Sequence, residues 1–184
     1  MQDTDREVGD LRWYAIWTRA RHEKAVRDRL RGHGIETLLP IWQRLNQWKD
    51  RRKVIEVPLF PGYCMARFPF TERLAVLQTP GVADIVRHGG QIAPIPKEEI
   101  EALRTLVQCG FPCRPHPFPK EGMWVEVVRG PLMGVKGILV RHDRSARLVI
   151  GVTLIRQAAT VDVDVADVTH IRKPPRPQPH IAVR

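Results

Sequence analysis

The sequence predicts an α+β protein made of two parts. The first is an α/β sandwich, an antiparallel sheet with helices, at residues 12–110, and the second is a small five-stranded β-barrel at residues 120–172. In the first part, strand-like runs are interspersed with helical patterns, which is typical of helices packed on one sheet. A segment with four prolines in nine residues, 111–119, separates the two parts as a stiff linker. Five β-rich runs with turns between them follow.

The first part opens with an aromatic and β-branched strand at 13–18 and a basic helix at 21–33. Val26 and Leu30 lie four residues apart on one face of this helix, and Gly34 marks its end in a left-handed conformation. The remaining elements are strands at 35–42, 53–59, 63–68 and 82–87, and helices at 71–78 and 95–110. A polar arm joins the strands at 35–42 and 53–59.

The helix at 95–110 carries the clearest local signals. Pro96 stands at its start, acids fill its first turn, and Gly110 closes it. Its predicted buried face consists of Ile100, Leu103 and Val107. The acids Glu98, Glu99 and Glu101 are explained by this first turn and do not indicate an acid/base pair.

In the second part, the expected strands are at 123–128, 137–142, 147–155, 159–165 and 168–171. The polar segment 1–11 and the Pro-rich basic tail 173–184 are expected to be disordered.

Composition narrows the class of protein. Hydrophobic residues make up 43% and charged residues 27% of the 184 residues, as in a globular protein. No apolar run reaches the roughly 18 residues that a membrane span needs, and the acidic N-terminus is unlike a secretory signal. Three cysteines, an odd number, fit a reducing compartment. These observations predict a cytoplasmic protein without a membrane contact.

Positive charge is concentrated in the first third of the chain. The net charge is +10, and residues 12–53 contain 12 Lys or Arg against 4 acids. Such an excess favours a surface that contacts nucleic-acid phosphates, and an ordinary solvated helix face is the alternative. The candidate contacts are Arg19, Arg21, His22, Lys24, Arg51, Arg52 and Lys53.

The stretch VRGPLMGVKGILVR at 128–141 has the glycines and lysine of a phosphate-binding loop. A P-loop, however, needs Gly-Lys-Ser or Gly-Lys-Thr followed by a helix, and here a strand-like run follows. We therefore interpret it as a hairpin loop in which Gly137 permits a close backbone approach. Leu132, Met133 and Val135 then form an apolar tip that either folds onto the barrel or meets a partner.

A few residues outside these motifs have the chemistry of metal or catalytic sites. Cys109, Cys113 and His116 have C-x3-C-x2-H spacing, but no second ligand pair accompanies them, so a zinc site is the weaker interpretation. No nucleophile or acid/base motif is present, and the chain is expected to be no enzyme and to need no cofactor or metal.

The aromatic residues fall into two groups. Trp13 and Phe68 are expected in the core, whereas Trp17 ends its strand and Phe60 lies in a turn. We expect these last two in an exposed apolar patch that docks on a partner.

Three motifs then occur in order: WYAIWTRARHEK, LFPGYCMARF and EGMWVEVVRGPLMGVKGILVR, with TPGVADIVR and PIPKEEIEAL between the last two. Over about residues 12–172 the chain resembles the NusG family of transcription elongation and antitermination factors. The resemblance implies an NGN domain followed by a KOW domain, an SH3-like β-barrel.

The resemblance also implies a function: binding RNA polymerase as a monomer and suppressing pausing or termination. By motif position, the residues facing the beta-prime clamp helices would be Trp17, Phe60, Pro61, Tyr63 and Ile85. Arg73 would reach the beta-subunit lobe, and the basic residues after Trp17 would approach upstream or non-template DNA.

The KOW domain would recruit a partner, and in the family this partner is termination factor Rho or a small-subunit ribosomal protein. The residues expected to bind it are Leu132, Met133, Lys136, Leu154, Ile155 and Arg156. The family loop F-G-R-x-T-P-V-E is replaced here by IRQAATVD at 155–162. Loss of the aromatic anchor weakens the expectation of either partner and favours a specialised paralog of the RfaH or UpxY kind.

Two rival functions remain open at this point. A stand-alone RNA-binding or ribosome-associated KOW protein would also be basic, but it would not require LFPGY or Trp17. A zinc enzyme would require stoichiometric metal at residues 109–116.

Overall fold

The computed structural model describes residues 10–47, 52–110, 113–117, 119, 122–142 and 145–172. The chain divides by its contacts into two compact units. One takes its described residues from 10–39 and 61–100, and the other from 40–60 and 101–172. The expected domain boundary at 111–119 stays a prediction, because a division by contacts does not test which segment folds alone.

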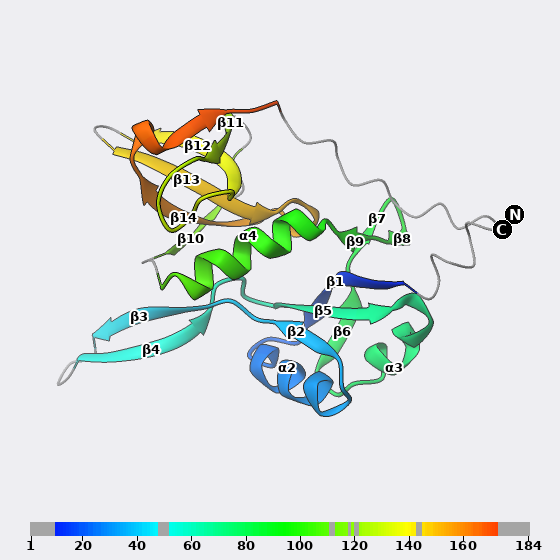
Figure 1. The fold of residues 1–184 in the computed structure, drawn as a ribbon. Coiled ribbons are helices and arrows are strands. Elements are labelled where there is room, and N and C mark those ends of the chain that lie inside the picture. Colours follow the sequence, from blue (N-terminus) through cyan, green and yellow to red (C-terminus); the bar gives the residue numbers. More distant parts are fainter. Residues whose placement is uncertain are drawn as a thin grey trace, which may run out of the picture. The chain divides into compact units, whose positions relative to one another are not determined.

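The first unit is built on an antiparallel sheet, the N-terminal sheet. Its strands run in the order β2 (Glu36–Leu38), β5 (Tyr63–Pro69), β1 (Leu11–Thr18) and β6 (Val82–Ile85), and β9 (Pro94–Ile95) also pairs with β1. The helices α2 (Glu23–Gly32) and α3 (Arg73–Leu77) lie on one face of it (Figure 1). A short helical turn, η1 (Phe70–Glu72), precedes α3, and the small hairpin β7 (Arg87–His88)–β8 (Gln91–Ile92) follows β6.

Alternation along the strands explains the core of this unit. Tyr14 of β1 and Phe68 of β5 point toward the helices, with their ring centroids 4.7 Å apart, and pack with Val26 and Leu30 of α2. Neighbouring residues point to the opposite face, as the two-residue period of a strand requires. The predicted burial of Trp13 and Phe68 is confirmed.

Two details of the helices differ from the prediction. The expected helix at 21–33 begins only at Glu23, because Arg21 has a left-handed φ of 63° that no α-helix can contain. In α4 (Lys97–Gln108), Val107 is 41% exposed rather than buried. The residue buried next after Leu103 is Leu106, three positions later, rather than Val107, four positions later.

The second unit contains a six-stranded antiparallel sheet, the C-terminal sheet. Its order is β10 (Arg114–Pro117), β14 (Gln157–Val163), β13 (Ser145–Val152), β12 (Lys136–His142), β11 (Met123–Val127) and β15 (Val168–His170). The turns η2 (Thr153–Ile155) and η3 (Val165–Asp167) join its later strands. The unit also holds the two-stranded ribbon β3 (Ile41–Gln47)–β4 (Arg52–Pro58).

The five strands expected within residues 120–172 are present as β11 to β15, and a sixth strand from outside that range joins their sheet. Part of the Pro-rich segment 111–119, expected to be an extended linker, forms β10 and pairs with residues 157–160 of β14. Prolines are tolerated there because an edge strand needs hydrogen-bond donors on one side only. Closure of the sheet into a barrel stays a prediction.

The glycine-rich loop connects β11 to β12 and is a hairpin loop, as predicted. Leu132 and Val135 are buried whereas Met133 is 68% exposed, so the apolar tip mostly folds inward. A Cβ added to Gly137 would lie 2.6 Å from the carbonyl oxygen of Val149, which confirms the predicted close approach.

Several expectations lie outside the described residues. These are the disorder of residues 1–9 and 173–184 and the role of Arg51. Residues 10 and 11, which were also expected to be disordered, are described, and Leu11 begins β1. The backbones of Arg52 and Lys53 are described in β4, but the conformations of their side chains are not.

Candidate functional site

One end of the N-terminal sheet leaves a tryptophan in solvent. Trp17, near the end of β1, is 53% exposed, although Ile16 before it is fully buried. The strand register places Tyr63 of β5 opposite Trp17 on one side and Asp84 of β6 on the other. An open pocket of about 260 Å³ lies there, and the residues lining it, called the Trp17 surface below, are Trp17, Tyr63, Asp84, Ile85, Val86 and Arg87.

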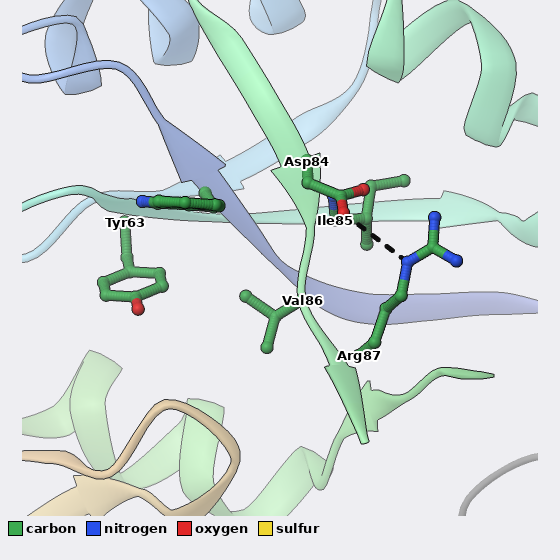
Figure 2. Close-up of a pocket in the computed structure, with 6 residues that line it drawn as sticks. Tyr63, Asp84, Ile85, Val86 and Arg87 are labelled. Carbon is green, nitrogen blue, oxygen red and sulfur yellow. Dashed lines mark hydrogen bonds and ion pairs between the residues drawn. The ribbon is translucent and has the colours of Figure 1, made fainter. Parts of the chain in front are cut away.

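The Trp17 surface has an apolar side and a charged side. In Figure 2 the Val86 side chain points to the side on which the Tyr63 ring lies, whereas the Arg87 side chain extends the other way toward Asp84. Arg87 Nε lies 3.5 Å from Asp84 Oδ2, and Asp84 Oδ1 accepts a 2.8 Å hydrogen bond from the backbone N–H of Ile85. Such a site can hold an apolar side chain of a partner beside a fixed ion pair.

The turn that precedes β5 forms part of the wall beside Trp17. Gly62 has a φ of 83°, which favours glycine, and a Cβ at this position would lie 4.0 Å from Trp17 Cδ1 and Nε1. Its N–H donates a 2.7 Å hydrogen bond to Glu23 Oε1, and its carbonyl accepts a 2.8 Å bond from the N–H of Thr18. A side chain of α2 therefore holds this turn in place.

The structure brings together only some of the residues that the sequence assigned to polymerase contact. Trp17, Tyr63 and Ile85 line one pocket, and Pro61 is exposed in the adjoining turn. Phe60, at 1% exposure, is buried, so its expected exposure was wrong, and Ile85 is fully buried as well. Their roles in binding stay predictions.

Arg73 does begin the short helix α3, as expected. Its guanidinium lies 4.6 Å from the centroid of the Phe70 ring, and its Nη1 donates a 3.2 Å hydrogen bond to the Phe70 carbonyl. The side chain is half-buried, so a cation–π contact orients it before any partner is present.

A short basic loop, residues 19–22, connects β1 to α2. Arg19, Arg21 and His22 are exposed, and Lys24 in the first turn of α2 is half-buried. The N–H of Arg19 donates a 2.8 Å bond to the Gly81 carbonyl, and the N–H of His22 donates a 3.0 Å bond to the Arg19 carbonyl. Because Arg21 is not glycine, its left-handed backbone conformation is strained, and its charged side chain is exposed.

The arginines within α2 have intramolecular partners. Arg27 Nε lies 2.8 Å from Asp28 Oδ1, and this hydrogen bond holds the pKa of the Asp28 carboxyl below its usual value. Arg29 donates a 2.6 Å hydrogen bond to the Pro80 carbonyl, and Arg31 donates a 2.8 Å bond to Thr37 Oγ1. The basic loop is consequently a better candidate for phosphate contact than the helix face.

In the C-terminal sheet, the residues expected to bind a partner divide by exposure. Leu132 and Ile155 are buried, and Leu154 is half-buried. The exposed ones are Met133, Lys136 and Arg156, of which Lys136 lies 3.8 Å from Glu126 Oε2 and Arg156 has a left-handed φ of 53°.

Sequence reasoning missed Glu23, Asp84, Val86 and Arg87. Glu23 lies in the first turn of a mostly basic helix, and an acid at that position is ordinarily explained by the helix dipole alone. Asp84 lies opposite Trp17 because of the strand register, and Val86 and Arg87 directly follow β6. This register cannot be inferred from a single sequence.

The described residues contain no group of three or more His, Cys, Asp or Glu side chains that could hold a metal ion. Cys109 Sγ instead donates a hydrogen bond to the Pro131 carbonyl at 3.3 Å. Half-burial raises the pKa of Cys113. None of the helices in the described part of the chain is long and apolar enough to span a membrane.

Comparison with known proteins agrees with this architecture. A family model described as transcription termination factor NusG matches residues 11–104. A structure on domain interaction in Thermotoga maritima NusG aligns with a TM-score of 0.50 and 21% identity, over 89% of this chain and 98% of that one, and supports the fold.

Two structures of the MjSpt4:Spt5 complex give weaker matches. Conformation B has a TM-score of 0.30 and 17% identity, over 89% of this chain and 99% of that one. Conformation A has a TM-score of 0.28 and 18% identity, over 88% and 99%. No curated protein matched the chain.

Proposed function

We propose that this chain, which belongs to the NusG family, binds RNA polymerase through the Trp17 surface and suppresses pausing or termination. The NusG family consists of transcription elongation factors rather than enzymes. The observation that carries the proposal is the exposure of Trp17 beside Tyr63 and Val86 at the end of a well-packed sheet. Tryptophans of this kind are frequent hot spots of protein interfaces.

The Trp17 surface suits a partner that offers an apolar side chain beside a polar group. The beta-prime clamp helices would place apolar side chains against Trp17, Tyr63 and Val86, with the Asp84–Arg87 ion pair at the rim. Arg73, already oriented by Phe70, would face the beta-subunit lobe. Burial of the aromatic ring would supply most of the affinity.

The basic loop gives this binding mode a second contact. It begins two residues after Trp17, so a polymerase bound at the Trp17 surface would have Arg19 and Arg21 close to its upstream or non-template DNA. Contacts of this type to phosphates carry no sequence information, but they add affinity that falls with salt.

The mechanism requires no chemistry on the protein. A factor that binds the closed clamp more tightly than the open clamp shifts the population toward the closed, elongating state. The free energy of this shift equals the difference between the two binding free energies. The protein would act as a monomer in the cytoplasm, where polymerase works.

The C-terminal sheet would recruit a further partner through Met133, Lys136 and Arg156. Burial of Ile155 supports the proposal of a specialised, RfaH- or UpxY-like paralog. The position of the family's aromatic anchor here carries an aliphatic side chain that points inward. A partner bound by this loop would meet the exposed, charged Arg156 instead.

Transcription across a pause and an intrinsic terminator, with and without the protein, tests this function. We expect the wild type to shorten the pause and raise read-through, and Trp17→Ala to do neither while keeping the fold. An unchanged transcript pattern with the wild type would contradict the proposal. Tight RNA binding with a steep salt dependence and no effect on polymerase would favour the stand-alone RNA-binding protein.

A further inference from the structure

We propose that Glu23 is a positioning residue that holds the Trp17 surface and the basic loop together as one rigid binding surface. This inference rests on the proposed function. Glu23 would fix the spacing that lets the Trp17 surface and the basic loop bind the transcription complex at the same time. Three sets of observations support it: the burial of the carboxylate, its hydrogen bond to a distant turn, and the anchoring of the loop beside it.

The burial of Glu23 is unusual for an acid. Its side chain is 7% exposed in the first turn of α2. Burying a carboxylate without a partner is costly, so a buried acid needs a hydrogen-bond donor. The donor is the backbone N–H of Gly62, which lies 39 positions further along the chain. Its nitrogen is 2.7 Å from Glu23 Oε1. A hydrogen bond to a charged acceptor is stronger than one between neutral groups.

The turn that Glu23 holds is part of the Trp17 surface. The Gly62 peptide is fixed on both sides, because its N–H bonds to Glu23 and its carbonyl accepts from the N–H of Thr18 at 2.8 Å. Thr18 directly follows Trp17, and Tyr63 directly follows Gly62. Without the carboxylate, the left-handed Gly62 would lose its side-chain tether and the Trp17 ring its fixed neighbour.

The same residue borders the basic loop. Glu23 comes directly after His22, so its tether also fixes the end of the loop. The start of the loop is fixed by the 2.8 Å hydrogen bond from the Arg19 N–H to the Gly81 carbonyl. Gly81 packs closely on His22, whose Cβ would lie 3.2 Å from an added Cβ. The distance between the apolar and cationic contacts is thereby set before binding, which lowers the ordering cost of association.

Three substitutions at Glu23 test the length of the side chain, its charge and its removal separately. Glu23→Ala removes the acceptor, Glu23→Asp keeps the charge but shortens the side chain, and Glu23→Gln keeps an acceptor oxygen at the original distance. The matched control is Glu98→Ala, because Glu98 also lies in the first turn of a helix, α4, but is exposed. Affinity for purified RNA polymerase and hydrogen exchange of the Gly62 amide are measured for each.

We expect Glu23→Ala and Glu23→Asp to bind polymerase about tenfold more weakly, as loss of one such hydrogen bond implies. The Gly62 amide should exchange faster in both, while the amides of β1 and β5 stay protected. Glu23→Gln should recover most of the affinity, and Glu98→Ala should match the wild type. A merely structural role for Glu23 would lower protection across the whole sheet instead.

The outcomes distinguish this inference from the function on which it rests. If the wild type binds polymerase, Trp17→Ala does not, and Glu23→Ala and Glu23→Asp bind like the wild type, the inference is wrong and the proposed function stands. If the wild type does not bind polymerase, both are wrong. Should Glu23→Ala fail to fold, Glu23→Asp compared with Glu23→Gln gives the same decision.

Discussion

Two glycine turns of this molecule have similar backbone conformations but are held in different ways. Gly62 and Gly134 both have left-handed φ values, of 83° and 85°. Each has a large exposed apolar side chain nearby: Trp17, 53% exposed, and Met133, 68% exposed.

The loop around Gly134 is closed by its own neighbours. Its N–H donates a 2.8 Å hydrogen bond to the Val127 carbonyl, and the N–H of Val127 donates a 2.9 Å bond to the Val135 carbonyl. The turn at Gly62 is held instead by Thr18 and by the side chain of Glu23, both distant in sequence. A turn held by tertiary contacts can have its position adjusted by a remote substitution. The Gly62 turn is therefore the one at which binding geometry can be tuned.

The largest expected effect separates the two exposed side chains. Trp17→Ala should weaken polymerase binding about 30-fold or more, which corresponds to the ~2 kcal/mol of an interface hot spot. Met133→Ala removes a more exposed side chain and should leave polymerase affinity unchanged. Surface-plasmon or fluorescence titration with purified polymerase gives both values. Equal losses of polymerase affinity in the two variants would mean that the two exposed side chains do not differ in polymerase contact.

The second effect concerns stability near the glycine-rich loop. Gly137→Ala places a Cβ 2.6 Å from the Val149 carbonyl oxygen and 2.9 Å from Leu148 Cδ1, so the strands must move apart. We expect the free energy of unfolding to fall by about 2 kcal/mol, as in overpacked cores.

The matched control for Gly137 is Gly32→Ala in the last turn of α2, where an added Cβ meets nothing within 4 Å. Urea denaturation should show it equal to or slightly more stable than the wild type. A Gly137→Ala protein as stable as this control would show that β12 and β13 are packed less tightly than described.

The third effect compares the two turns directly. Gly62→Ala and Gly134→Ala each force a left-handed φ on alanine, which costs about 1 kcal/mol of unfolding free energy. Neither added Cβ is crowded, so strain alone should set the loss. Only Gly62→Ala should also weaken polymerase binding. Weaker binding by Gly134→Ala would mean that the C-terminal sheet contacts polymerase too.

The smallest effect concerns the basic loop. Arg21→Gly removes one cation and relieves the left-handed strain, so the free energy of unfolding should change by less than about 1 kcal/mol. The slope of log affinity for DNA against log salt should fall by about one. Arg114→Ala, at an exposed arginine of β10, serves as the control and should keep the wild-type slope. An unchanged slope in Arg21→Gly would exclude a phosphate contact by this residue.

Features of the fold that depend on local pattern could be predicted from the sequence. Trp13 and Phe68, the aromatic residues expected in the core, are buried, and Gly34 ended α2 with a φ of 78°. The strand β10 was missed because prolines form a strand only when a partner such as β14 is available. The start of α2 was misplaced because nothing in the sequence distinguishes a left-handed Arg21 from a helical one.

The candidate site was predictable to the same extent. Trp17 was found because it ends a strand, which is a local property. The burial of Phe60 and the role of Glu23 depend on contacts with residues far along the chain, and no periodicity reports these. The sequence indicated a turn at Phe60, but it predicted neither the left-handed φ of Gly62 nor the hydrogen bond from Gly62 to Glu23.

The proposed function requires that the Trp17 surface, and not the glycine-rich loop, contacts RNA polymerase. Replacing Tyr63 or Met133 with a photocrosslinking benzoylphenylalanine and irradiating an elongation complex tests it directly. Position 63 borders the pocket, and position 133 is the most exposed apolar site of the C-terminal loop. We expect a crosslink to the beta-prime subunit from position 63 and none to it from position 133. A crosslink to polymerase from position 133 alone would contradict the claim.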